Sequence, residues 1–306
     1  MTRRFFADAD ELASLVRTCN AEMWIRGPSS SPSSLDVVNV GEIEIHSIHL
    51  TPAMTAAISV RQDLVRLSIP VAREADWTIQ GRPFDVGNVL LAGPRDWYVA
   101  ASEAAVDFIV VYIPVERFLE RRHALHREAP AGVPSGIFSP DPRALRAARS
   151  AISTLCSFAT GCPELEPRPD VDRVALGPLL DSLVRIVDAA AAERAPPLPG
   201  HIVRQLEEFM RAHEDEPLYV SDLCTVASAS ERTVRNVFNN VYGTSPARYL
   251  RLRRLNQAHR ALRRRETGGV RVTDVAMRYG FLDVGRFAAE YRQTFGEYPS
   301  QTRRRA

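Results

Sequence analysis

The chain has 306 residues, of which 45% are hydrophobic and 25% charged, and its net charge is +2. This length suggests about two domains, and the composition is typical of a soluble globular protein rather than a disordered one. The longest strongly apolar run, Phe108–Val115, is far shorter than the roughly 20 residues that span a bilayer. The first residues lack the apolar stretch of a secretory signal and the four cysteines form no Cys-x-x-Cys pair, so we expect a cytoplasmic protein without a membrane anchor or disulfide scaffold.

The charge is unevenly distributed along the chain. Residues 1–200 carry 20 Arg and 25 acidic residues, a net charge of −5, whereas residues 201–306 carry 19 Arg and 12 acidic residues, a net charge of +7. A basic C-terminal third next to an acidic front indicates that the C-terminal third binds a polyanion. A merely solvated basic face is the alternative explanation of the charge.

The N-terminal region is typical of short antiparallel strands followed by helices. Segments that alternate or are rich in β-branched residues are punctuated by Gly and Pro, which favours a sandwich or barrel. The expected strands are Leu35–Val40, Glu42–Leu50, Ala56–Val60, Leu64–Ile69, Trp77–Gln80 and Val106–Ile113. Helical spacing then predicts helices over Val115–His126, Asp141–Ala159 and Asp170–Ala192, the last restarted or kinked at Pro178.

Some side chains of this β-region are candidates for binding a ligand. His46 and His49 lie three residues apart on one expected strand, so they point to opposite faces and suit a shared metal poorly. We therefore predict neither a metal nor a cofactor. Aromatic residues are candidates for lining a small-molecule cavity, with ordinary core packing as the alternative; they are Trp77, Phe84, Trp97, Tyr98 and Phe108.

Three prolines and a glycine within residues 193–200 cannot continue a helix and predict an extended linker. The linker divides the chain into a domain of residues 1–192 and a domain of residues 201–306. The second domain is helical in pattern throughout. Its expected helices cover residues 200–214, 221–227, 230–242, 245–262, 273–279 and 283–294, with a last one after Pro299, and Ser245, Thr273 and Asp283 are expected N-caps.

Two segments of this helical domain have the same architecture. Each is a short helix, a tight turn and a longer helix that ends in Gly-x-x-Pro. The shared spacing is five residues and then three, in Phe238, Gly243 and Pro246 and again in Tyr291, Gly296 and Pro299. Such a repeat is what two helix-turn-helix modules need, because one helix braces while the next enters the major groove of DNA.

The repeat resembles the DNA-binding domain of the AraC/XylS family of bacterial transcription regulators. The most specific stretch is Asp274–Phe281, followed by the Gly-x-x-Pro-Ser end at Gly296, and the resemblance covers about 100 residues, Leu198–Arg305. It implies a nucleoid-associated regulator that binds double-stranded DNA. It also implies a cupin-like β-barrel that senses a small-molecule effector and forms a homodimer through a helix such as Val171–Val187, with RNA polymerase as a further candidate partner. The expected fold class is thus α+β: this barrel with flanking helices, then an all-α domain with two helix-turn-helix modules.

By motif position, the resemblance places base-reading side chains at Arg232, Arg235 and Asn236. Arginine suits guanine and asparagine suits adenine in direct readout. The second reading helix offers few hydrogen-bonding side chains, so we expect the first module to supply more of the specificity. The residues expected to contact DNA are Ser230, Glu231, Arg232, Arg235, Asn236, Asn239, Asp283, Val284, Gly285, Arg286, Ala289 and Glu290.

Between the two modules, the helix of residues 245–262 carries five arginines, which either add positive potential near DNA or form a solvated face; they are Arg248, Arg251, Arg253, Arg254 and Arg260. A different class of protein is an enzyme delivered by its DNA-binding domain. A cupin oxygenase would need a metal triad and a DNA-repair methyltransferase a Pro-Cys-His-Arg-type motif, and neither is found in the sequence. We therefore expect no enzymatic activity. The effector, the operator and the direction of regulation stay open.

Overall fold

Two antiparallel sheets face each other in the N-terminal region of the computed structural model. The structure describes residues 2–6, 11–12, 18–29, 31–71, 77–127, 132–161, 176–190, 201–213, 216–263 and 271–305. The seven-stranded sheet has the order β1 (Thr2–Phe6), β3 (Ser33–Val40), β4 (Ile43–Leu50), β11 (Val106–Pro114), β6 (Leu64–Pro70), β9 (Val89–Ala92) and β12 (Gly136–Phe138). The five-stranded sheet has the order β2 (Cys19–Ile25), β5 (Met54–Val60), β10 (Trp97–Ser102), β7 (Trp77–Ile79) and β8 (Arg82–Pro83).

Each sheet ends in its own edge strands, so the region is an open two-sheet sandwich rather than the closed barrel expected from the sequence. All six expected strands are present, as β3, β4, β5, β6, β7 and β11. Side chains alternate across both sheets, as the pleat requires. In β6, Val65 and Leu67 belong to the core cluster on the outer face, whereas Arg66 and Ser68 line the space between the sheets.

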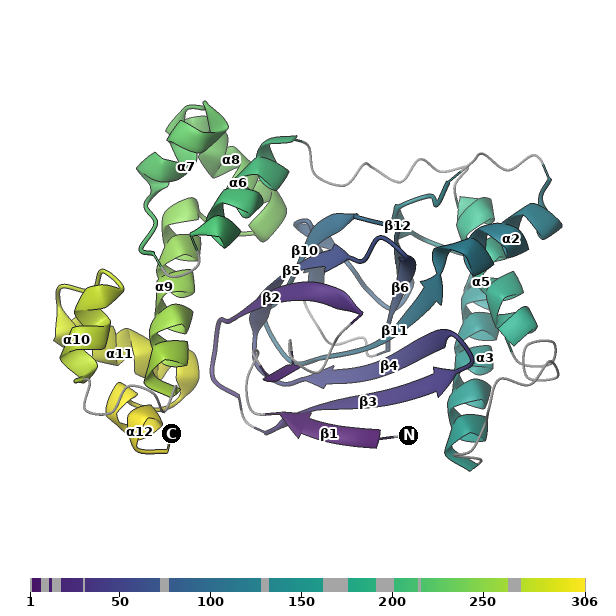
Figure 1. The fold of residues 1–306 in the computed structure, drawn as a ribbon, viewed down its shortest axis with the longest axis horizontal. Coiled ribbons are helices and arrows are strands. Elements are labelled where there is room, and N and C mark those ends of the chain that lie inside the picture. Colours follow the sequence, from purple (N-terminus) through teal and green to yellow (C-terminus); the bar gives the residue numbers. More distant parts are fainter. Residues whose placement is uncertain are drawn as a thin grey trace.

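Helices cover the outer face of the seven-stranded sheet. They are α2 (Val115–Leu125), α3 (Pro142–Gly161) and α5 (Gly177–Ala190), and their buried apolar side chains form one core with that sheet (Figure 1). The expected helix at residues 170–192 is observed as α5 from Gly177 onward, with Pro178 in its first turn, where the missing N–H of proline costs nothing. Residues 170–175 and the expected linker, residues 193–200, lie outside the described residues.

The C-terminal helices confirm the repeat. They are α6 (His201–Ala212), α7 (Val220–Ala227), α8 (Glu231–Tyr242), α9 (Pro246–Arg263), α10 (Val272–Arg278), α11 (Val284–Phe295) and α12 (Pro299–Arg305). Ser230 and Asp283 cap α8 and α11, and Gly243 and Gly296 end the same helices in the left-handed region, at φ of 63° and 76°. Glycine adopts this conformation without the steric penalty of a Cβ atom.

The start of α10 differs from the expected one. Thr273 is not its N-cap; Arg271 is, and the backbone N–H of Arg271 donates to Asp274 Oδ2 at 3.3 Å. The short helix of the first module begins in the same way, with the N–H of Tyr219 donating to Asp222 Oδ2 at 2.8 Å. An acidic residue three positions into the helix, rather than a cap hydroxyl, therefore anchors both short helices.

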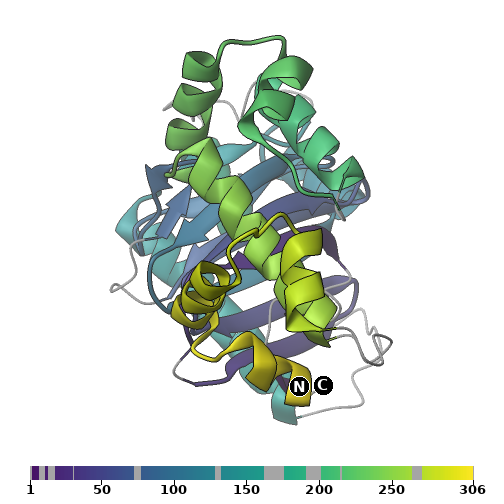
Figure 2. The same ribbon diagram turned by 90° about the vertical axis from the view of Figure 1, so that its left-hand side faces the viewer.

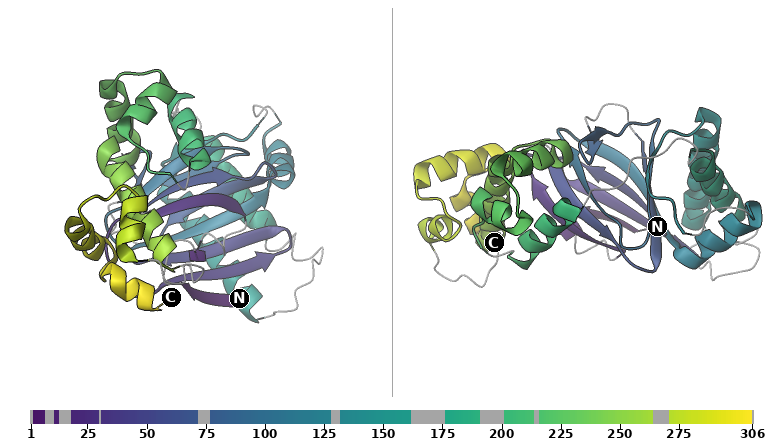
Figure 3. Two further views of the ribbon diagram at one scale, coloured as in Figure 1. Left: turned by 60° about the vertical axis from the view of Figure 1, so that its left-hand side comes forward. Right: turned by 90° about the horizontal axis from the view of Figure 1, so that it is seen from above.

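The helical domain packs on the outer face of the five-stranded sheet, opposite to α2, α3 and α5. Seen from above, the helical domain, the two sheets and the remaining helices follow one another as layers (Figure 3). Figure 2 shows α9 running diagonally between the two modules, with α10 and α11 near one end and α7 and α8 near the other. With 18 residues, α9 is about 27 Å long, a length comparable with one turn of DNA, ~34 Å.

Candidate functional site

The first candidate reading helix, α8, presents a polar exposed face. Val234 and Phe238 are fully buried, and the residues expected to contact DNA all lie on the exposed surface of this helix or at its cap. They are Ser230, Glu231, Arg232, Arg235, Asn236 and Asn239. The Ser230 hydroxyl accepts from the N–H of Thr233 at 3.2 Å, so this side chain already serves as the cap of α8.

Arg235 forms an ion pair with Glu231, its neighbour one turn earlier on α8. The Arg235 guanidinium donates to Glu231 Oε1 at 2.7 Å, and the two side chains are 59% and 63% exposed. Exposed pairs of this kind contribute little to stability, about 0–1 kcal/mol, because water screens them. Arg235 can therefore leave Glu231 for a base edge or a phosphate at small cost.

The second candidate reading helix, α11, is built differently. Gly285, Arg286 and Ala289 are exposed and Val284 is half-buried, while the Asp283 carboxylate caps the helix by accepting from the N–H of Arg286 at 2.9 Å. The exposed apolar residues of this face have no hydrogen bond to offer a base. The exposed face of α11 therefore carries fewer hydrogen-bonding side chains than that of α8.

Glu290, expected to contact DNA, is engaged inside the protein. Arg251 of α9 donates two hydrogen bonds to its carboxylate, at 2.6 and 2.7 Å, and Arg286 donates a third at 3.1 Å. Partial burial acts to raise the pKa of Glu290, but the hydrogen bonds from Arg251 and Arg286 outweigh it and lower that pKa. Glu290 therefore holds α11 against α9 as a carboxylate.

The arginines of α9 are mostly structural rather than a solvated basic face. Arg253 is buried and donates to the backbone carbonyl groups of Met210 at 2.6 Å and His213 at 3.0 Å, which lie in the last turn of α6 and just after it. The guanidinium of Arg254 lies 5.4 Å from the centre of the Tyr219 ring. Of the five arginines, Arg248 is the one whose side chain is exposed. The sequence could not distinguish these roles, because spacing gives only the helix face and not its neighbours.

The five-stranded sheet and the helical domain share one apolar cluster. Trp24, Ala57 and Val99 project from β2, β5 and β10 into the core formed by α6, α7, α8 and α9. The Trp24 ring meets that of Tyr249 edge-on, at 5.4 Å between centres. Arg211 of α6 also pairs with Glu22 of β2 at 3.1 Å. The contact between the two regions is therefore a packed interface with both apolar and charged contacts.

A buried carboxyl group lies beside this interface. Glu207 of α6 accepts a hydrogen bond from the Tyr242 hydroxyl, and its Oε2 has no hydrogen-bond partner. Burial, with a contribution from Glu22, raises the pKa of Glu207 to about 7 although the Tyr242 hydrogen bond lowers it. Burial also raises the pKa of Tyr242, so the phenol stays protonated and donates.

The turn between β7 and β8 contacts the end of α8. Gln80 and Gly81 have φ values of 57° and 71°, the pattern of a type I′ hairpin turn. A Cβ atom on Gly81 would lie 1.9 Å from the carbonyl oxygen of Asn240, far inside van der Waals contact. Glycine is required here both by the turn and by this close approach of the sandwich to the candidate reading helix.

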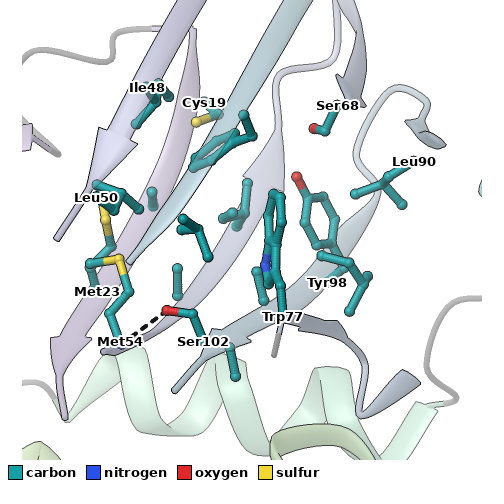
Figure 4. Close-up of a pocket in the computed structure, with 18 of the residues that line it drawn as sticks. Cys19, Met23, Ile48, Leu50, Met54, Ser68, Trp77, Leu90, Tyr98 and Ser102 are labelled. Atoms are coloured by element: carbon teal, nitrogen blue, oxygen red, sulfur yellow. Dashed lines mark hydrogen bonds between the residues drawn. The ribbon is translucent and has the colours of Figure 1, made fainter. Parts of the chain in front are cut away.

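Between the two sheets lies a cavity of about 50 Å³, several times the roughly 10–15 Å³ that one water molecule needs. Of the expected aromatic residues, Trp77 and Tyr98 (Figure 4) line it together with Phe108. Phe84 packs in the core beside Trp77, and Trp97 lies against the helical domain. Arg66 and Ser68, which also line the cavity, were not expected from the sequence. Their alternation with Val65, Leu67 and Ile69 is a polar stripe on an otherwise apolar strand, which is a usable signal.

The two histidines of β4 lie apart, as expected. His46 is buried and bonded to Glu44, and His49 is half-buried and hydrogen-bonded to Asp107 at 2.6 Å. Among the described residues, no three His, Cys, Asp or Glu side chains cluster so as to hold a metal ion. In the same part of the chain, no helix combines the length and apolar character needed to cross a membrane.

Known proteins resemble chiefly the helical domain. A family model described as a helix-turn-helix domain matches residues 223–305. The probable thc operon regulatory protein of Rhodococcus erythropolis is 42% identical over 109 residues, which are 36% of this chain and 32% of that relative. The XylDLEGF operon transcriptional activator 2 of Pseudomonas putida is 34% identical over 124 residues, or 40% of this chain and 76% of that relative. The chain thus spans about a third of the length of the Rhodococcus relative.

Two solved structures are also similar to parts of the chain. A probable AraC family transcriptional regulator from Rhodopseudomonas palustris shares 34% identity, with 35% of this chain and 98% of that chain covered and a TM-score of 0.32. The AraC-like transcriptional activator CuxR shares 13% identity, with 84% and 95% covered and a TM-score of 0.42. The match of residues 223–305 to the helix-turn-helix family model and the two modules of the fold define the class as a DNA-binding protein. On the sequence relationship to the Pseudomonas activator, the chain belongs to the AraC/XylS family of transcription regulators.

Proposed function

We propose that the protein is a transcription regulator that reads its operator chiefly through α8. The observation that carries this is the contrast between the two helices: α8 exposes Arg232, Arg235 and Asn236, whereas Glu290 of α11 is held by Arg251. Arginine and asparagine form bidentate bonds to guanine and adenine in the major groove. In this proposal, α8 supplies base contacts and α11 mainly positions the domain through apolar and backbone contacts.

Affinity of the full chain for its selected operator and for single-base variants, at one fixed salt concentration, tests this division. Arg235→Ala is expected to cost roughly 1–3 kcal/mol on the operator and to relax preference at one base pair. Ala289→Ser, on the exposed face of α11, is the matched control and is expected to do much less. Equal loss on every variant would mean that Arg235 holds a phosphate. Affinity for all sequences should fall with salt, with a log–log slope of about −0.9 per phosphate contact.

We further propose that a small-molecule effector binds in the cavity and changes how the helical domain docks. Support comes from the shared strands: Met23 and Ala56 face the cavity, whereas their neighbours Trp24 and Ala57 contact the DNA-binding helices. Ala56→Leu, which fills the cavity, is expected to change operator affinity. Combining it with Asn256→Ala, which weakens the docking, should abolish that effect. Simple additivity of the two substitutions would contradict the coupling.

The domain division and the partners follow from the same proposal. Residues 1–192 form the sensing domain, residues 193–200 the linker and residues 201–306 the DNA-binding domain, so a fragment from Pro199 onward should fold and bind DNA.

A homodimer that contacts RNA polymerase fits the family. The apolar side chains of α5 are already buried within the chain, so a dimer contact through α5 would use polar residues such as Ser182 and Arg185. Sedimentation of the full chain tests the oligomeric state.

A further inference from the structure

The cavity between the sheets contains a buried cation. Arg66 of β6 is 4% exposed, and its Nε donates to the Tyr112 hydroxyl at 3.3 Å. Its guanidinium carbon lies 5.4 Å from the centre of the Tyr98 ring and 5.8 Å from that of Tyr112. None of the described residues that line the cavity is Asp or Glu. Within the described part of the chain, the charge of Arg66 thus faces the cavity without a carboxylate.

Tyr112 does not supply the missing negative charge. It is fully buried, and burial raises its pKa far above the ordinary value although the nearby Arg66 acts to lower it. The phenol therefore stays neutral and accepts the hydrogen bond from Arg66 while donating to Cys19 Sγ at 3.5 Å. Aromatic faces attract a cation but only partly offset the cost of removing it from water. A buried guanidinium in these surroundings is stabilised by an anion.

Two hydroxyl groups of the cavity also lack partners. Ser68 and Tyr98 are buried, and neither Ser68 Oγ nor the Tyr98 hydroxyl oxygen forms a hydrogen bond in the structure. Figure 4 shows the Tyr98 hydroxyl pointing toward Ser68, and Ser68 lies two residues from Arg66 on the same face of β6. Buried polar groups rarely stay unpaired, because each costs the free energy of its lost hydration. Two hydroxyl groups without a hydrogen-bond partner thus line the same cavity as the Arg66 guanidinium.

The rest of the cavity is apolar. Its walls include Trp77, Phe108, Met23 and Met54, and the side chains around them are mainly aliphatic. Methionine adapts its shape to irregular ligands, and aromatic rings offer flat surfaces to a ring or chain. With a volume of about 50 Å³, the cavity suits one compact group rather than a long chain.

We propose that this cavity binds a compact organic anion, with its carboxylate on Arg66, Ser68 and Tyr98 and its apolar body against Trp77 and Phe108. The inference rests on the proposed role of the cavity as the effector site and adds the chemical class of the ligand. A neutral polar molecule would satisfy the hydroxyls and leave the charge of Arg66 unpaired. A cation would be repelled. An anion satisfies all three groups together, and charge-assisted hydrogen bonds are the strongest of the possible ones.

Calorimetric titration of the full chain, without DNA, tests the class with matched pairs of probes. The pairs are propionate with propionamide and butyrate with butyramide, which are small enough for the cavity, keep the shape and remove the charge. We expect at least one acid to bind roughly tenfold or more tightly than its amide. Arg66→Met should erase this preference and Arg66→Lys should retain part of it. Arg61→Met is the control, since Arg61 is half exposed and pairs with Asp63.

The proposal stays testable even if Arg66→Met fails to fold, because the ratio of acid affinity to amide affinity is measured on the unmodified protein. Amides that bind as well as their acids, no binding of either acid, or an equal loss with Arg61→Met would overturn the anion site. Operator binding is measured separately, on DNA. If the protein binds its operator but the titration fails, the proposed ligand class is wrong and the proposed role as a regulator stands. If the protein binds the anion but not the operator, the anion site stands and the proposed role as a regulator is wrong.

Discussion

Asn256 of α9 hydrogen-bonds to both backbone groups of Ile25 in β2. The Ile25 N–H donates to Asn256 Oδ1 at 2.9 Å, and Asn256 Nδ2 donates to the Ile25 carbonyl oxygen at 3.0 Å. β2 is an edge strand of its sheet, and edge strands leave backbone groups unpaired. One amide side chain of the DNA-binding domain thus acts as the neighbouring strand would, and it fixes the sandwich against α9.

Replacing this amide should weaken the docking between sandwich and helices. Asn256→Ala leaves the buried N–H and carbonyl of Ile25 without partners, so we expect the free energy of unfolding to fall by about 1–3 kcal/mol. Differential scanning calorimetry should also show the two domains unfolding in more separate steps. Asn239→Ala, on the exposed face of α8, should leave the calorimetric profile unchanged. An unaltered profile for Asn256→Ala would contradict a role in docking.

Two glycines with similar backbone angles allow the cost of backbone strain to be measured separately from the cost of a steric overlap. Gly81 and Gly243 have φ of 71° and 63°, but a Cβ on Gly243 would meet nothing within 4 Å. Gly243→Ala should therefore cost only the left-handed strain, about 1–2 kcal/mol. Gly81→Ala adds the overlap with Asn240 and should cost a further 1–3 kcal/mol or so. Urea unfolding of both variants measures the difference; equal costs would mean that the turn does not press on α8.

The position of α11 should depend on the charge of Glu290. Glu290→Gln removes the charge from the bonds with Arg251 and Arg286 and should lower stability by about 1 kcal/mol near neutral pH. Because the pKa of Glu290 is lowered in the folded protein, its contribution is complete above the unfolded value and disappears as pH falls through the folded one. Melting temperatures of both proteins should therefore converge in acid. A constant gap at every pH would argue against the carboxylate.

The stability contributed by Glu207 should depend on pH in the opposite direction to that of Glu290. Its folded pKa of about 7 lies above the ordinary value of 4.5, so the folded state holds the proton more tightly and loses stability as pH rises through about 7. Glu207→Gln keeps the hydrogen bond from Tyr242 without a charge. We expect this variant to be more stable than the unmodified protein above that pH and to melt with a flatter pH profile. Glu208→Gln, its exposed neighbour on α6, should change neither property.

The helix-turn-helix repeat could be predicted because its determinants are local. Ser230 and Asp283 cap their helices through their own side chains, and Gly243 and Gly296 end them by their own conformational freedom. Each of these caps and helix ends can be recognised from a few neighbouring residues in the sequence. The prediction of Thr273 as the N-cap of α10 was wrong because a hydroxyl near a helix start is a common cap. In the structure, Asp274 anchors this helix start instead, from a position inside the helix.

The strands and contacts that escaped prediction depend on distant parts of the chain. β10 is rich in alanine and β2 has few β-branched residues, so neither has strong strand propensity. Both are stabilised from two sides, by the core between the sheets and by the helical domain. The roles of Arg253 and Asn256 likewise come from backbone groups of other elements. No spacing within their own helix specifies such partners.

Because side chains alternate along β2, neighbouring residues of this strand face different parts of the protein. Cys19, Ala21 and Met23 face the cavity, while Glu22 and Trp24 face the DNA-binding helices. Substitutions at alternate positions can therefore change the lining of the cavity while leaving the docking surface intact. Inserting or deleting one residue in this strand would exchange the two sets at once. The docking surface thus tolerates changes at every second residue of β2, but not a change in the length of the strand.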